Sequence, residues 1–394
     1  MKEDVMLTPG PTEVSTEVIA AMMKPAIAHY DPDFNLGTLV ETLEMLQQIY
    51  RTENEVILVP GSGRVALETS ITSVIEEGDK VLTITAGIFG RWMKEMVERV
   101  GGETVELAVE WGQPIDEETL KNKLEGEDFK ALTMVHNEST TGSAYNLDKV
   151  SKHLRGKDVL FMVDTVSSLG GARIETDELG IDFNMSACHK CIGTPPGVAF
   201  TTISDRGWEA MEARDKPATS FSYDLLRWKT MWLPEERGGD LIFGWRRQPI
   251  TIPTHSVYAL HKACELILEE GYEARVQRHK RAAESFRKGV RALGLDLFPH
   301  EDVISNTMTS IDFPERISSS EVKDELAQRY NIKVGGGNEE LRGKIIRFAH
   351  MNLTANYNYL STALTALAAC LQRRNFSCDL EKALRVTEET YYEG

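Results

Sequence analysis

The sequence predicts an α/β protein in which a mostly parallel sheet forms a large domain and a smaller α+β C-terminal domain follows it. Two observations support this prediction. Short apolar segments alternate with amphipathic helical segments between residues 55 and 164, a pattern typical of a parallel sheet covered by helices on both faces. From about residue 255 the pattern changes to a long helical stretch followed by short strands and helices, which indicates a second domain.

The segments of the large domain follow one another in regular alternation. Each predicted strand is a run of six or seven mainly apolar residues, the length and composition expected of a buried strand. Helical periodicity fills much of the chain between these runs. The predicted strands are 55–60, 80–85, 103–109, 131–136 and 159–164, and the predicted helices are 64–77, 91–100 and 146–156.

The C-terminal part of the chain begins with a long helical stretch at 256–293. Strands are predicted there at 309–314, 331–337 and 344–351, and a last helix ends near Arg374. A stretch rich in Arg, Trp and Gly at 216–250 is interpreted as an excursion near the active site. The predicted division is therefore an N-terminal segment (1–15), a large domain (16–255), a small C-terminal domain (256–374) and an acidic helical tail (375–394).

The composition excludes several classes of protein. The net charge is −17 and no run of five basic residues occurs, whereas nucleic-acid binders need clustered Lys and Arg. No apolar run approaches the roughly 20 residues that cross a bilayer, and the N-terminus lacks the apolar core of a secretory signal. We therefore expect a cytoplasmic protein with no nucleic-acid or membrane partner, whose five cysteines are reduced.

A lysine between two cysteines is the most unusual local feature, in "MSACHKCIGTPPG" (185–197). A structural zinc site normally needs a second pair of Cys or His, and the other cysteines are isolated, so we expect no metal. A redox dithiol normally opens a helix, but Pro195 and Pro196 closely follow Cys191. The two cysteines are best interpreted as small buried residues, which leaves Lys190 as the residue with a chemical role.

The carboxylate of Asp164 is a second candidate functional group. It stands at the end of the predicted strand 159–164. Ligands of open α/β sheets bind beyond the carboxyl ends of the strands. An aspartate there can simply cap the following turn. Pyridoxal phosphate (PLP), however, requires a carboxylate for its ring nitrogen and a lysine for its Schiff base. Asp164 and Lys190, on nearby strand ends, would supply both.

The segment "PGSGRVALE" (60–68) follows a strand and opens a helix. The N–H groups of Ser62, Gly63 and Arg64 would therefore face a phosphate at a helix N-terminus. The same segment fits a loose G-x-G-x-x-A fingerprint, so an oxidoreductase that binds a nucleotide cofactor on the GSGRVA loop is the alternative from a different class. That alternative expects an acidic residue at the end of the next strand, where the sequence reads TITAG (83–87).

Five motifs are spread over residues 7–197: "LTPGPTEV" (7–14), "PGSGRVALE" (60–68), "VHNESTTG" (135–142), "VDTVSSLGG" (163–171) and "SACHKCIGTPPG" (186–197). Together and in this order they resemble the class V PLP-dependent aminotransferases, most strongly the alanine–glyoxylate and serine–pyruvate group. The resemblance covers nearly the whole chain. It implies a fold-type I transferase with a mostly parallel seven-stranded sheet, which works as a homodimer with shared active sites.

The resemblance also implies a role for each site residue. Lys190 would form the Schiff base with PLP and carry protons, and Asp164 would keep the pyridine nitrogen protonated. Arg347 would bind the substrate carboxylate through its two-pronged guanidinium. The other cofactor contacts would come from Val166 and Phe89 on the two ring faces, Ser139 near the ring oxygen, and Ser62, Gly63, Arg64, His189 and Thr251 of the neighbouring subunit around the phosphate.

Several positions differ from the alanine–glyoxylate pattern. Gln248 stands where that group tends to have an aromatic residue, Arg64 where it has His, and Phe89 where it has Trp. Arg64 and Phe89 look more like the ureidoglycine–glyoxylate branch, and "HYDPDF" (29–34) like the pyridoxamine–pyruvate branch. We expect an aminotransferase that moves an amino group from a small amino acid, such as alanine or serine, to glyoxylate or pyruvate by a ping-pong mechanism, with those two branches as alternatives.

Overall fold

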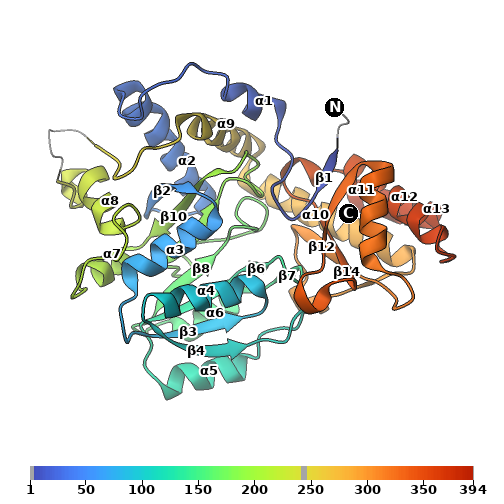
Figure 1. Cartoon of the computed structure of the whole chain (residues 1–394), viewed down its shortest axis with the longest axis horizontal. Coiled ribbons are helices and arrows are strands. Elements are labelled where there is room, and N and C mark those ends of the chain that lie inside the picture. The colour runs from blue at the N-terminus through green and yellow to red at the C-terminus, as the bar shows by residue number, and fades with distance from the viewer. Residues whose placement is uncertain (1–3, 241–245, 394) are drawn as a thin grey trace.

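The computed structural model describes residues 4–240 and 246–393, and most of its strands belong to two sheets (Figure 1). The larger sheet contains seven strands, in the order β2 (Glu55–Gly61), β10 (Gly197–Ile203), β9 (Phe183–Ala187), β8 (Leu160–Asp164), β5 (Ala131–Val135), β3 (Lys80–Thr85) and β4 (Glu103–Ala108). Neighbouring strands run parallel except β10, which is antiparallel to both β2 and β9. The sheet is therefore mostly parallel, as predicted.

The five predicted strands of the large domain all form, with ends within one residue of the predicted bounds. Two further strands of the seven-stranded sheet, β9 and β10, were not among them. The segment of β9 reads FNMSA, in which polar residues interrupt the apolar run, although all five residues are buried. β9 lies between β8 and β10, whereas β10 pairs with β2 from a distant part of the chain, and local pattern alone does not reveal that pairing.

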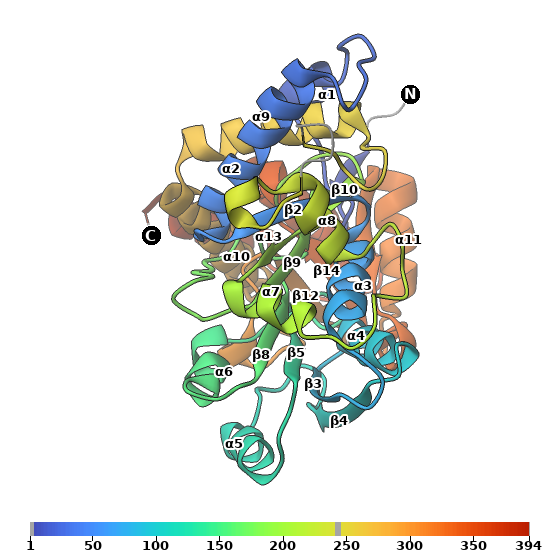
Figure 2. The ribbon, with the colours of Figure 1, turned by 90° about the vertical axis from the view of Figure 1, so that its left-hand side faces the viewer.

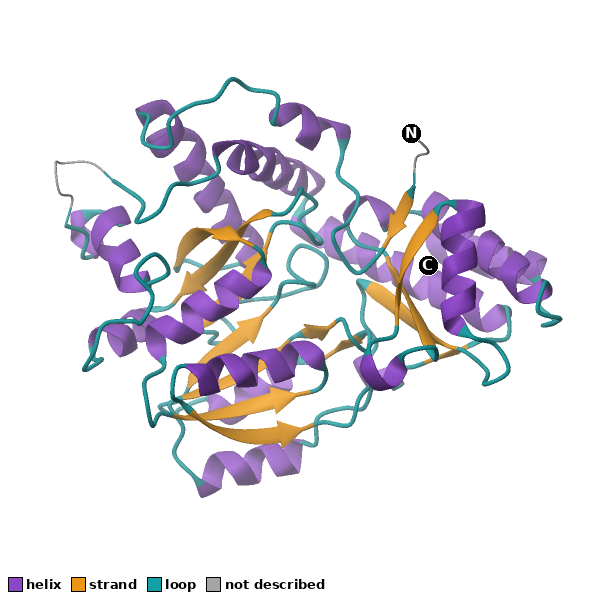
Figure 3. Cartoon of the chain, in the orientation of Figure 1, coloured by secondary structure: helices purple, strands orange, loops and turns teal. Residues whose placement is uncertain are grey.

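Helices cover both faces of the large sheet (Figure 3). Figure 2 shows α3 and α4 on one side of the central strands and α6 on the other. The helical elements of the large domain are α1 (Thr16–Ala21), the π-helical turn η1 (Asp33–Thr38), α2 (Leu39–Tyr50), α3 (Gly63–Val74), α4 (Ile88–Arg99), α5 (Glu117–Gly126), α6 (Leu147–Leu154), α7 (Asp205–Glu212), α8 (Leu225–Trp232) and η2 (Glu235–Arg237).

The smaller sheet combines the two ends of the chain. Its order is β1 (Val5–Leu7), β13 (Ile332–Gly336), β14 (Ile345–Ala349), β12 (Met308–Asp312) and β11 (Asp296–Leu297), with β1 parallel to β13 (Figure 1). Leu7 is buried in the core of this sheet. The predicted N-terminal segment therefore adds a strand to the C-terminal domain. The helices and short turns there are α10 (Tyr272–Ala292), η3 (Glu301–Val303), α11 (Ser319–Tyr330), η4 (Glu339–Leu341), η5 (Asn352–Thr354), α12 (Tyr357–Gln372) and α13 (Leu380–Glu393).

The predicted helical stretch at 256–293 is two helices, because Gly271 interrupts it with a φ of +85°. The first of them, α9 (Thr254–Glu270), buries Val257, Leu260 and Ile267 in the core of the large sheet. α9, most of which follows the predicted domain boundary at residue 255, thus packs on the core of the large sheet. The predicted tail also packs: Ala383 of α13 lies in the core of the small sheet.

The excursion at 216–250 is anchored to the large domain by its aromatic residues. Trp228 and Trp232 of α8 are buried in the core of the large sheet. Residues 241–245 of the excursion lie outside the described residues. Within the ranges 4–240 and 246–393, no helix has both the length and the apolar character needed to span a bilayer.

A candidate active site at the carboxyl ends of five strands

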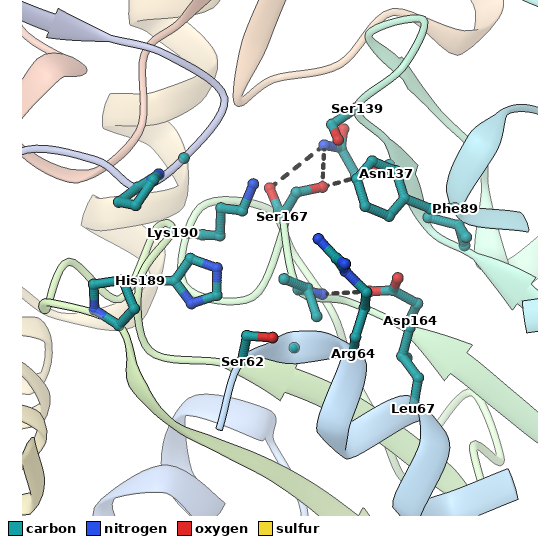
Figure 4. A pocket seen from close by; sticks show the side chains of 16 residues that line it. Ser62, Arg64, Leu67, Phe89, Asn137, Ser139, Asp164, Ser167, His189 and Lys190 are labelled. Atoms are coloured by element: carbon teal, nitrogen blue, oxygen red, sulfur yellow. Dashed lines mark hydrogen bonds between the residues drawn. The ribbon is translucent and has the colours of Figure 1, made fainter. Parts of the chain in front are cut away.

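Chain segments that follow β2, β3, β5, β8 and β9 meet at one cavity of about 330 Å³ (Figure 4). Four of these strands, β9, β8, β5 and β3, are successive parallel neighbours in the sheet, so their carboxyl ends share one edge. Most of the predicted site residues line this cavity. Its lining residues are Gly10, Pro11, Ser62, Gly63, Arg64, Leu67, Phe89, Val135, Asn137, Ser139, Asp164, Val166, Ser167, His189, Lys190 and Pro196.

Lys190 lies in the turn after β9, and its side chain extends into the cavity (Figure 4). Burial lowers the pKa of its ammonium group to about 8, although the carboxylate of Asp164 opposes this shift. Its Nζ donates a hydrogen bond to the carbonyl oxygen of Pro9. A buried lysine with such a pKa is partly neutral near pH 8, as a nucleophilic amine must be.

Asp164 ends β8 and is 4% exposed. Its Oδ1 accepts a hydrogen bond of 2.8 Å from the N–H of Val166. Burial raises the pKa of the Asp164 carboxyl to about 7, with a smaller raising contribution from Glu138. Desolvation disfavours the ionised carboxylate, so this group is suited to a partner that brings a positive charge or a proton.

The N-terminus of α3 faces the cavity and has no side-chain cap of its own. Ser62 is the N-cap residue, and its side chain makes no capping hydrogen bond. A Cβ atom on Gly63 would lie 2.5 Å from Cγ2 of Val166, so only glycine lets this turn pack so closely. Unsatisfied N–H groups and the helix dipole together form a site for an anion.

Two side chains, the cationic Arg64 and the polar His189, lie beside this helix N-terminus in the cavity lining. The Arg64 guanidinium lies 4.6 Å from the centre of the Trp92 ring, and none of the ion pairs in the described part of the chain includes Arg64. Nδ1 of His189 is buried without a hydrogen-bond partner in the structure. Burial and the nearby charges of Lys190 and Arg64 lower the pKa of His189 to about 4, so its imidazole is neutral.

Asn137 and Ser167 were not among the predicted site residues, yet they stand between Lys190 and Ser139 in the cavity wall (Figure 4). Nδ2 of Asn137 donates to Oγ of Ser167 at 2.7 Å, and Oγ of Ser167 donates to the Asn137 carbonyl at 2.6 Å. Both residues lie within quoted motifs and follow strand ends. Their position after β5 and β8 is the signal that could have identified them.

Arg347 approaches the site from β14 of the small domain. It is 7% exposed, and burial lowers the pKa of its guanidinium to about 10. Nη1 donates to the carbonyl of Ser139, while Nε and Nη2 donate to the carbonyl of Gly336 at 3.0 and 2.6 Å. No ion pair among the described residues involves Arg347. This buried cation is therefore held by carbonyl groups alone, with N–H groups left for a carboxylate.

Thr251 is exposed and lies outside this cavity. It lines a separate groove together with residues 27–30 and 252–256. The structure of one chain does not bring Thr251 to Lys190, so its predicted contact with the phosphate depends on a second subunit.

The group of residues around the cavity fits PLP. A buried carboxylate and a lysine line the same cavity, and an uncapped helix end with a free arginine can receive the phosphate. Cys188 and Cys191 are buried free thiols whose Sγ atoms donate to backbone carbonyls, in line with their interpretation as small core residues. In the described ranges, no three His, Cys, Asp or Glu side chains are grouped to hold a metal ion.

Comparison with known proteins identifies the family. An uncharacterized aminotransferase of Methanocaldococcus jannaschii is 37% identical over 98% of this chain and 97% of its own. The crystal structure of the ureidoglycine–glyoxylate aminotransferase of Bacillus subtilis is 31% identical, with a TM-score of 0.92 over 99% of this chain and 98% of its own. That of the pyridoxamine–pyruvate aminotransferase of Mesorhizobium loti is 25% identical, with a TM-score of 0.91 over 99% and 97%.

These likenesses confirm the predicted fold of a fold-type I PLP transferase. Alanine–glyoxylate aminotransferases are also among the similar proteins, as the sequence motifs indicated. The comparisons favour an aminotransferase over the nucleotide-dependent oxidoreductase that the glycine loop left open. A family model described as "Aminotransferase class-V" matches residues 9–351, and the chain therefore belongs to the class V aminotransferase family.

Proposed function

We propose that the protein uses PLP to move an amino group from a small amino acid or amine to glyoxylate or pyruvate. The observation that carries this proposal is the position of Arg347, a buried cation without an acidic partner in the described chain, bonded to the backbone of Ser139 in the wall of the cavity that holds Lys190. Its free N–H groups suit the carboxylate that 2-oxo acids and amino acids share. The names of similar proteins support both acceptors.

The cofactor would be held by residues from both sides of the cavity. When bound, PLP supplies an aldehyde that accepts the amino group and a ring that withdraws electrons from the substrate. Asp164 would keep a proton at the ring nitrogen, and Lys190 would take a proton from the substrate Cα and return it. The surrounding contacts would come from Ser62, Gly63, Arg64, Phe89, Ser139, Val166 and His189.

The size of the cavity favours small substrates. Its volume of about 330 Å³ lies at the low end of the range for ligand pockets, and the cofactor would take up much of it. Arg347 would select for a carboxylate, and the remaining space suits a short side chain. Alanine, serine and ureidoglycine are therefore the first donors to test, and pyridoxamine, which has no carboxylate, is the comparison.

A homodimer would complete the site with Thr251. Four exposed apolar side chains, Ile19, Met23, Tyr30 and Leu36, occur between residues 19 and 36, and Tyr30 lines the groove around Thr251. A second copy of the chain would cover such side chains and bring Thr251 to the neighbouring phosphate. The net charge of −17 argues against a nucleic-acid partner.

The test is the absorption spectrum of the purified protein with PLP, before and after each donor is added singly. We expect a yellow Schiff-base band that one donor removes and that glyoxylate or pyruvate restores. Lys190→Ala should lack the band, whereas Lys149→Ala, an exposed lysine on α6, should behave like the wild type. A protein that gains no band with PLP, or a spectrum indifferent to the loss of Lys190, would contradict the proposal.

A further inference from the structure

The start of α4 is capped from another part of the chain. The N-cap residue of this helix is Gly87, which has no side chain to accept a hydrogen bond. The N–H groups of Phe89 and Gly90 instead donate to Oε2 of Glu138, at 3.1 and 3.2 Å. The N–H of Ile88 donates to Oγ1 of Thr140 at 3.2 Å. A carboxylate at a helix N-terminus is favoured by the helix dipole.

Glu138 is fully buried and uses both carboxylate oxygens. It lies in the short ribbon of β6 (Asn137–Glu138) and β7 (Ser143–Ala144), and its exposed fraction is 0%. Oε1 accepts a hydrogen bond of 2.9 Å from the N–H of Thr140. No ion pair in the part of the chain that the structure describes includes Glu138. Burial of an acidic group without a salt-bridge partner is costly, and burial raises its pKa, so its retention needs an explanation.

The two segments that Glu138 joins both carry residues of the cavity wall. One is the first turn of α4, which carries Phe89, and the other is the loop after β6, which carries Ser139. The carbonyl of Ser139 in turn accepts a hydrogen bond from Nη1 of Arg347. A displacement of the Glu138 carboxylate would therefore reach a cofactor contact and the substrate-binding arginine together.

We propose that Glu138 is a positioning residue of the active site, which fixes Phe89 against Ser139 and thereby sets the orientation of Arg347. This inference rests on the proposed function, because it takes Phe89 as a contact of the cofactor and Arg347 as a contact of the substrate. Glu138 itself does not line the cavity, so its effect on the reaction is indirect.

The first test compares Glu138→Gln with Asp182→Asn. Glutamine keeps the shape of the side chain, but its amide nitrogen is a donor and leaves either Thr140 or the α4 turn without an acceptor. Asp182 is a matched control: it is 2% exposed, accepts hydrogen bonds from Phe161 and Ser204, and precedes β9 at the end opposite Lys190. Both variants should unfold at a lower temperature than the wild type.

Only Glu138→Gln should weaken the binding of PLP and of the 2-oxo acid. We expect its dissociation constant for PLP and its KM for the 2-oxo acid to rise about tenfold, with a smaller loss in kcat, as the loss of a hydrogen bond to a charged group predicts. The circular dichroism of the bound cofactor should change as well. If Asp182→Asn alters these quantities by the same factor, or Glu138→Gln leaves them unchanged, Glu138 only stabilises the fold and the inference is wrong.

Gly87→Ala provides an independent test that keeps the carboxylate. A Cβ atom on Gly87 would lie 2.4 Å from Cδ of Glu138, and φ at this residue is 169°, an extended conformation that alanine adopts readily. The added methyl should displace Glu138 and raise both the dissociation constant for PLP and the KM for the 2-oxo acid. If Glu138→Gln fails to fold, this variant alone tests whether Glu138 positions the site. If the wild-type protein shows no absorption band with PLP, the proposed function is wrong. If the wild type shows the band but the variants bind PLP and the 2-oxo acid normally, only the inference about Glu138 is wrong.

Discussion

Nζ of Lys190 donates a hydrogen bond to the carbonyl oxygen of Pro9, so the N-terminal segment lies directly against the reactive amine. The next residue, Gly10, has a φ of +117°, and a Cβ atom there would lie 2.5 Å from Cδ, Cε and Nζ of Lys190. The segment is also bonded to the lysine turn itself, since Oγ1 of Thr12 donates to the Lys190 carbonyl at 2.9 Å. This close approach fixes where the amine can move.

Gly10→Ala should therefore impair the site far more than its backbone strain alone predicts. The added methyl would push the Lys190 side chain away from its place, and we expect the rate of Schiff-base formation with PLP to fall at least about tenfold. Gly78→Ala is the control, because Gly78 has a φ of +88° but no neighbouring atom within 4 Å. Stopped-flow absorbance measures both rates, and equal rates in the two variants would contradict the role of Gly10.

Arg347→Lys should separate substrates that carry a carboxylate from those that do not. A lysine cannot reproduce the planar guanidinium that bonds both the Ser139 and the Gly336 carbonyls. We expect KM for glyoxylate or pyruvate to rise about 10- to 100-fold, the range for a lost hydrogen bond to a charged group. The half-reaction with pyridoxamine, which has no carboxylate, should change much less. An equal loss with both kinds of substrate would show that Arg347 acts only through the fold.

In the PLP-free protein, the stability that the Asp164 carboxyl contributes should be lost between about pH 4 and pH 7, which is measured as the difference between the wild type and Asp164→Asn. The pKa of Asp164 rises from 3.8 to about 7 on folding, so the folded state binds the proton more tightly. This contribution to the free energy of unfolding is complete below the unfolded pKa and is lost as the pH rises through the folded one. Asp164→Asn should remove this dependence and be more stable than the wild type at pH 8, by on the order of a few kcal/mol.

Urea denaturation at pH 5 and pH 8 measures this difference. The comparison stops at pH 8 because the pKa of Lys190 is lowered to about 8. Above that pH the titration of Lys190 also changes the free energy of unfolding. Asp164→Asn should nevertheless be inactive as an aminotransferase. A wild type and variant with parallel stability profiles would mean that Asp164 is ionised in both states.

Mixing two impaired variants tests whether the active sites are shared. Lys190→Ala removes the amine, and Thr251→Ala, in the exposed groove, removes the proposed phosphate contact of the neighbouring subunit. A dimer with one subunit of each kind would hold one site with both residues intact. We expect the mixture, refolded together at limiting PLP, to exceed the mean activity of the two separate variants. Activity equal to that mean would place Thr251 outside the shared site.

The strands of the large sheet, and the meeting of Lys190 and Asp164 at one cavity, were largely predictable because the sequence signals for them are local. The apolar runs that form β3 and β8 are continuous in the sequence, and the bounds of β3 agree with those predicted. Lys190 and Asp164 were identified because each stands beside a strand end within a specific motif. Parallel strands bring such ends to one edge of a sheet, so the cavity itself could be inferred from the order of the segments.

Only the tertiary structure decided what depends on contacts between distant segments. The addition of β1 to the small sheet, the packing of α9 on the large core and the antiparallel direction of β10 follow from long-range pairing. Glu138 lies within a quoted motif, but its role at the start of α4 could not be predicted, because its partners Phe89 and Gly90 are 49 and 48 residues away. Sequence pattern reports the burial and periodicity of a segment, whereas the neighbour of a buried carboxylate is set by how the whole chain packs.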